Sequence, residues 1–145
     1  MKKILLSLIS IFILASASDI PTRTGTFPDK EMKSQNKKIA KLVAEEISST
    51  LPQVVDKYTT LVSVKSDNLT LIYTFEIKTG SKSDTTIIKE DHSKMKQAIT
   101  TGVCQASSKF LEVGINTSYI YVSAKTSTKL FRFDISQKDC LKIKK

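Results

Sequence analysis

The chain has 145 residues and a formal net charge of +9, from 23 lysines and arginines against 14 aspartates and glutamates. Only Arg23 and Arg132 are arginines, and the sequence has no zinc-finger spacing and no RRM-type aromatic motif. Because arginine supplies the planar fork that reads phosphates and base edges, this composition argues against a specific nucleic-acid reader. It favours a lysine-rich, solvated surface.

The N-terminal segment is typical of a secretory signal peptide. Lys2-Lys3 precedes an apolar run over residues 4–14, and Ala15-Ser16-Ala17 matches a cleavage site. We therefore predict a signal peptide over residues 1–17, cleaved between Ala17 and Ser18. The alternative is an uncleaved anchor, but the run is short for a bilayer core of ~30 Å. No cysteine follows the run to accept a lipid, so we expect a periplasmic or secreted protein with no transmembrane span after cleavage.

The rest of the chain predicts an extended leader over 18–29 and a single α+β domain over 30–145. Prolines and a glycine mark the leader. A helix is expected over 30–49, because apolar residues from Ile39 to Ile47 recur at three- and four-residue steps. Lys41 and Glu45 are spaced for an ion pair. The basic face of this helix is solvated, or it contacts an anionic membrane or an acidic partner.

Two hairpins and a second helix follow. Residues 58–78 read as a hairpin with its turn at 66–68, and the second strand alternates apolar and polar residues. A loop over 79–84 leads to a helix over 89–111, which Gly114 would cap. Strands over 115–124 and 128–136 complete the second hairpin. The simplest arrangement of this helix–hairpin–helix–hairpin order is a four-stranded antiparallel sheet with both helices on one face.

Cys104 and Cys140 are the only cysteines. In an exported protein a disulfide between them is the default expectation. A redox or nucleophilic role is the alternative, but neither cysteine has a Cys-x-x-Cys spacing or a neighbouring histidine. We predict that the bond is structural and links the helix to the chain just after the last strand.

The phase of the third strand decides which side chains are exposed. If Tyr119 and Tyr121 face the core, an aliphatic strip is left on the open face of the sheet, and the opposite phase reverses this arrangement. Ile115 and Thr117 share the phase of the tyrosines, which favours tyrosines inside. The predicted interaction strip then consists of Ile72, Ile120, Val122, Leu130 and Arg132.

No catalytic, cofactor-binding or metal-binding motif emerges from the sequence. His92 is the only histidine, so a metal site lacks histidine or free-cysteine partners, and we expect a solvent-facing residue in a loop or at a helix end. Paired carboxylates could hydrolyse glycosides. Glu45-Glu46 and Glu90-Asp91 are adjacent pairs with lysines nearby, and solvated ion pairs explain them better.

The sequence resembles a family of small exported proteins of Proteobacteria for which no activity is established. The resemblance covers residues 51–140, and these motifs carry it: Leu51-Pro52, Asp56, Thr60-Leu61, Leu71-x-Tyr73-x-Phe75, Cys104, Phe110-Leu111-x-x-Gly114, Tyr119-x-Tyr121, Phe133 and Asp139-Cys140. It departs from the pattern at Gln105-Ala106, where an Asp-Pro is common, and over 125–128, where a glycine is common. The resemblance implies an exported disulfide domain and no particular activity.

Three functions follow as hypotheses. The first is a non-enzymatic periplasmic binding or adaptor domain whose partner is another periplasmic protein or an envelope component. The second is a small hydrolase with an unfamiliar site, which would need a cleft containing His92 or paired carboxylates with perturbed pKa. The third is lysine-mediated attachment to an anionic envelope surface, which salt would weaken. The sequence does not determine the oligomeric state.

Overall fold

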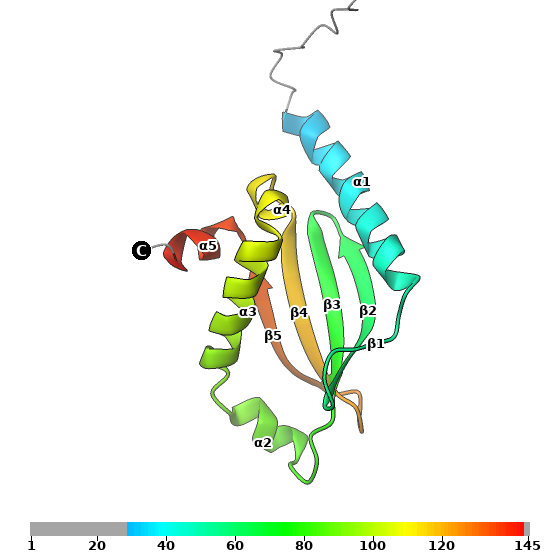
Figure 1. The fold of residues 1–145 in the computed structure, drawn as a ribbon, viewed down its shortest axis with the longest axis vertical. Helices are drawn as coiled ribbons and strands as arrows, with labels where there is room; N and C mark the ends of the chain where they lie inside the picture. The colour runs from blue at the N-terminus through cyan, green and yellow to red at the C-terminus, as the bar shows by residue number, and fades with distance from the viewer. Residues whose placement is uncertain (1–28, 144–145) are drawn as a thin grey trace, which may run out of the picture.

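The computed structural model describes residues 29–143, so the predicted signal peptide and nearly all of the predicted leader lie outside the described residues. The elements in chain order are α1 (Asp29–Ser48), β1 (Gln53–Val54), β2 (Thr59–Asp67), β3 (Thr70–Ile77), α2 (Asp84–Lys89), α3 (Ser93–Ala106), α4 (Ser108–Glu112), β4 (Asn116–Ser123), β5 (Lys129–Ile135) and α5 (Gln137–Ile143) (Figure 1). None of these helices is long and apolar enough to cross a membrane.

The sheet differs from the predicted four-stranded antiparallel one. Its order is β1-β2-β3-β4-β5, and β3 pairs with β4 in parallel. Both predicted hairpins, β2–β3 and β4–β5, are antiparallel as expected. The parallel pair arises because the chain leaves β3 through three helices and returns to the sheet in the same direction, as a crossover connection does. The short strand β1 adds an antiparallel edge beside β2.

The predicted helix over 89–111 is divided in the structure. Ser83 caps α2 by accepting a hydrogen bond from the Thr86 N–H at 3.2 Å, so helical structure begins before the predicted start. Glu90 is extended, and Asp91 Oδ1 then accepts the Ser93 N–H at 2.9 Å at the start of α3. A further break at Ser107 separates α3 from α4. Gly114, with φ +84°, follows α4 as predicted.

The C-terminal helix α5 was not predicted. The Ser136 N–H and hydroxyl both donate to Asp139 Oδ2 at 2.9 Å. The bond from the Ser136 N–H is one half of a capping box, and the Ser-x-x-Asp spacing of that motif is visible in the sequence. Asp139 therefore stabilises the start of α5.

The main core lies on the face of the sheet that α1 and α3 cover (Figure 1). Leu71, Phe75 and Tyr121 of β3 and β4 form one buried cluster with Ala40 and Ala44 of α1. Small alanines let α1 lie close to the sheet, and the Ser48 hydroxyl donates to the Val64 carbonyl at 2.7 Å. The phase with tyrosines inside is thus the observed one. A second cluster (Val103, Leu111, Ile135 and Cys140) joins α3, α4, β5 and α5.

Candidate functional site

A row of stacked aromatic rings crosses the core face of the sheet. Tyr73 stacks on Tyr119 at a centroid distance of 5.1 Å, and Phe75 stacks on Tyr121 at the same distance. Tyr121 in turn lies 4.7 Å from Phe131 of β5. Cross-strand aromatic pairs of this kind stabilise a sheet. The row therefore joins β3, β4 and β5 into one rigid surface.

The tyrosine hydroxyls of this row have unusual surroundings. Within residues 29–143, the hydroxyls of Tyr73, Tyr119 and Tyr121 make no hydrogen bond to protein. Burial, followed by the neighbouring Tyr73 and Tyr121, raises the pKa of Tyr119 to about 12. Burial, followed by the Asp56 charge, raises the pKa of Tyr121 to about 12, and burial also raises the pKa of Tyr73. These phenols stay neutral at physiological pH.

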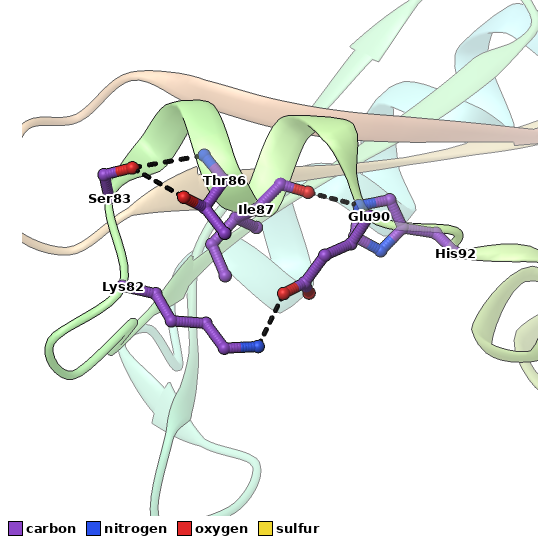
Figure 2. A network of polar contacts seen from close by, with 6 residues as sticks. All are labelled: Lys82, Ser83, Thr86, Ile87, Glu90 and His92. Atoms are coloured by element: carbon purple, nitrogen blue, oxygen red, sulfur yellow. Dashed lines mark hydrogen bonds and ion pairs between the residues drawn. The ribbon is translucent and has the colours of Figure 1, made fainter.

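His92 closes the row at the start of α3. Its ring lies 3.9 Å from that of Phe131, and its Nε2 is 2.9 Å from the Ile87 carbonyl oxygen (Figure 2). The ring is half-buried, which corrects the prediction of a solvent-facing histidine, although its place at a helix end was expected. With these contacts His92 joins α2 and the start of α3 to β5.

A pocket of about 360 Å³ opens beside His92, between α2 and the end of β3. Its apolar lining comes from separate parts of the chain: Tyr58, Ile77, Ile87, Met95 and Phe131. Lys78, Thr79, Glu90 and His92 complete it. Sequence analysis missed this site, because only the crossover brings α2 back to the sheet. The dipeptide Lys78-Thr79 at the end of the alternating strand was the available signal.

The predicted carboxylate pairs serve local structure. Glu45 pairs with Lys41 at 3.8 Å, as the spacing predicted. Glu90 lies 2.5 Å from Lys82 (Figure 2). Hydrogen bonds from the Ser93 side chain and N–H lower the pKa of Asp91. In the described part of the chain, no three histidine, cysteine, aspartate or glutamate side chains are grouped to hold a metal.

The structure separates the predicted interaction strip into two parts. Ile72, Ile120 and Val122 are partly buried on the face opposite α1 and α3, and Arg132 is exposed and pairs with Asp134 at 2.8 Å. Leu130 is only 4% exposed, so it does not belong to an accessible face. An irregularity in the β4–β5 pairing beside Tyr121 leaves Leu130 without a register partner, which a strictly alternating pattern cannot foresee.

A second surface carries exposed apolar side chains that the sequence did not single out. Met32, Ile39 and Leu42 lie at seven- and three-residue steps along α1, and Leu42 is 64% exposed. Asn36, between them, donates to the Val113 carbonyl at 2.9 Å and ties this part of α1 to the end of α4. We call Met32, Ile39 and Leu42 the α1 stripe. It is exposed on a helix whose other side packs on the sheet.

The predicted disulfide between Cys104 and Cys140 is present. It joins α3 to α5, with a Cα–Cα distance of 5.5 Å. The prediction placed Cys140 where the backbone leaves the last strand; α5 instead brings it beside α3. The disulfide therefore links α3 to α5 covalently, in addition to the packing of these helices in the second core cluster.

These features define a small disulfide-linked α+β domain with a mixed sheet covered on one face by helices. The chain belongs to the protein family described as "Domain of unknown function (DUF8479)", which matches residues 34–131. Membership of a family of unknown function agrees with the predicted resemblance to proteins for which no activity is established. No curated protein sequence matches the chain significantly.

Solved structures with a similar fold include two pilotins of type II secretion systems and one further bacterial protein. The type II secretion pilotin EpsS of Vibrio vulnificus has a TM-score of 0.63 at 12% identity, over 77% of this chain and 96% of that one. A protein of Pseudomonas aeruginosa that is inferred to be secreted gives 0.66 at 15%, over 80% and 99%. The Vibrio cholerae pilotin AspS gives 0.61 at 13%, over 77% and 97%. At these identities the likeness shows a shared fold.

Proposed function

We propose that this protein is a non-enzymatic exported adaptor that binds another protein of the cell envelope through the α1 stripe. The exposure of Ile39 and Leu42 carries the proposal, because large apolar side chains aligned on one exposed helix side favour contact with another chain. The inner side of the same helix, at Ala40 and Ala44, is already occupied by the sheet. A helix with apolar side chains on two sides can pack on the sheet with one side and contact a partner protein with the other.

The likeness to pilotins of type II secretion systems supports an accessory role in a secretion apparatus of the envelope. Removal of residues 1–17, which leaves Ser18 as the N-terminus, belongs to the same proposal, and so does a single domain over 30–145. Intact mass of the protein from the envelope fraction tests the cleavage.

The pattern Cys104, Tyr119-x-Tyr121 and Asp139-Cys140 is proposed as a family signature, because these residues build the disulfide, the aromatic row and the α5 cap.

The other functional hypotheses have weaker support. A hydrolase would need His92 free to act, yet its Nε2 faces the Ile87 carbonyl and its ring stacks on Phe131. Attachment to an anionic surface would use the exposed lysines of α1, and its binding would fall steeply with salt. An adaptor contact made by apolar side chains would instead persist at high salt.

The open sheet face remains the competing surface for the partner. Ile72, Ile120 and Val122 are partly buried there among polar neighbours, as is common when one sheet face meets water. The α1 stripe is more exposed, and its side chains project from a helix that packs on the sheet along one side only. We therefore assign the partner to α1 and treat the sheet strip as the alternative.

Photocrosslinking in the producing cell tests the assignment. A photoreactive amino acid at position 39 or 42 should give one discrete crosslinked envelope protein, and the same group at the exposed position 37, on the other flank of the helix, should give none. Leu42→Lys should abolish the crosslink from position 39. Crosslinks from position 120 or 122, with none from α1, would transfer the partner to the open sheet face. Absence of crosslinks from both surfaces would contradict the adaptor function.

A further inference from the structure

We propose that the pocket between α2 and the end of β3 binds a small amphipathic anion, an unbranched alkyl chain that ends in a carboxylate. This site is separate from the α1 stripe, and neither the family nor the solved neighbours assign a ligand to it. Two observations carry the proposal: the size and apolar lining of the pocket, and an uncompensated positive charge beside it.

The pocket has room for an alkyl chain. Its volume of about 360 Å³ is more than twice the ~150 Å³ of an engineered apolar cavity that takes up benzene. Ile77 and Phe131 extend from the sheet into it, and Ile87 and Met95 close it from the helical side. Methionine adapts to ligands of different shape. Burial of methylene groups against this lining supplies the affinity.

The polar part of the pocket is suited to an anionic head group. Thr79 also lines the pocket, but its hydroxyl oxygen is shielded from solvent, so a ligand in the pocket does not reach it. The head group is instead assigned to Lys78, which is exposed and forms no ion pair within residues 29–143. Its ammonium can approach a carboxylate at the mouth of the pocket, which gives a charge-assisted hydrogen bond.

Glu90 also lines the pocket but does not reverse its charge. Its carboxylate is paired with Lys82 at 2.5 Å, so the two charges cancel locally (Figure 2). Lys78 is then the uncompensated charge among the lining residues. A neutral alcohol would gain nothing from the charge of Lys78, and a cationic amphiphile would be repelled by it. The carboxylate is therefore preferred over both.

Isothermal titration calorimetry of the protein, in the form that the cell makes, with octanoate, octan-1-ol and octyltrimethylammonium tests this order. Octanoate should bind at least tenfold more tightly than the cation, and hexanoate should bind about tenfold more weakly than octanoate because two methylenes are lost. In ¹⁵N NMR spectra, octanoate should shift the amides of residues 77–79 and of Ile87 and Met95. Equal affinity for the three head groups, or shifts confined to other residues, would overturn the proposal.

Lys78→Met isolates the charge and keeps an unbranched apolar side chain. It should weaken octanoate about tenfold and leave octan-1-ol unchanged. Lys65→Met, which removes an exposed lysine of β2 outside the pocket, is the matched control and should leave both ligands unchanged. Melting temperatures of both variants check that they fold. Unchanged octanoate affinity in Lys78→Met would exclude the assigned head-group site.

Discussion

Cys104 of α3 is bonded to Cys140 of α5 across a sequence separation of 36 residues. The loop that the bond closes contains α4, β4 and β5, and both cysteines lie against Val103 and Leu111 in the second core cluster. The bond therefore holds the C-terminal helix on the helix that crosses between β3 and β4. It stabilises the arrangement that makes the sheet mixed.

Replacing both cysteines by alanine should lower the free energy of unfolding by about 3–4 kcal/mol, because the unfolded chain regains the entropy of an open loop. The melting temperature should fall by roughly 10 °C or more. Thermal unfolding followed by circular dichroism measures this. Wild-type protein that retains two thiols reactive under native, non-reducing conditions would contradict a structural disulfide.

The sequence was informative where local patterns decide structure. The alternation around Tyr73 and Phe75 identified β3 and its inward face, and the phase of Tyr119 and Tyr121 identified the inward face of β4. The chain has two cysteines, so only one intramolecular disulfide was possible. The apparent signal peptide made that disulfide the expected state. These inferences need only neighbouring residues or an unambiguous pairing.

Other features depend on contacts that no local pattern records. The parallel pairing of β3 with β4 is set by the path of the crossover, and the burial of Leu130 by an irregularity in the β4–β5 pairing. The pocket beside His92 requires α2, β3 and β5 to meet. The exposure of Leu42 depends on which side of α1 packs on the sheet, and its apolar spacing alone predicted burial. Helix α5 differs from these features, because the Ser-x-x-Asp spacing at its start, Ser136 to Asp139, is a local signal.

The raised tyrosine pKa values predict a loss of stability in alkali. A tyrosine in the unfolded chain ionises near the ordinary pKa of 10.0, whereas Tyr119 and Tyr121 in the folded protein ionise at about 12. Between these values the unfolded chain binds fewer protons, so the free energy of unfolding decreases as pH rises. The slope is up to about 1.4 kcal/mol per pH unit for each tyrosine. Below pH 10 this contribution is fully present.

Absorbance at 295 nm measures the two parts of this prediction. The folded protein should retain a phenol fraction that ionises only near pH 12, and the urea-unfolded chain should not. Urea unfolding at successive pH values gives the slope. Tyr119→Phe should reduce this slope by the contribution of one tyrosine, which is up to about 1.4 kcal/mol per pH unit. A folded-state titration that superimposes on that of the unfolded chain would show that the row is not desolvated.

His92 should be important for stability. His92→Ala removes the ring that stacks on Phe131 and one of the two hydrogen bonds to the Ile87 carbonyl, which also accepts the Glu90 N–H. We expect a loss of about 1–2 kcal/mol in the free energy of unfolding, with faster amide exchange in α2. His92→Phe keeps the stack and should recover part of the loss. A hydrolytic activity of the wild-type protein that disappears in His92→Ala would contradict this structural role.

The close seating of α1 on the sheet can be tested at Ala40, which has no exposed surface and lies in the main core cluster. Ala40→Leu should lower the free energy of unfolding by about 1–3 kcal/mol, because the larger side chain must displace α1 or its neighbours. Alanine and leucine have similar helix propensities, so the effect reports packing. Chemical denaturation measures it.

Lys38→Leu is the control on the same helix, since Lys38 is exposed and an exposed substitution should change the free energy of unfolding by less than about 0.5 kcal/mol.

Ala40→Leu has a further consequence, because α1 carries the proposed partner surface. Displacement of the helix from the sheet should also weaken the crosslink from position 39, although Ala40 faces away from the partner. If Ala40→Leu is as stable as the wild type, α1 is not held by close packing at this residue. If it is destabilised but the crosslink is unchanged, the α1 stripe binds without depending on how the helix is seated.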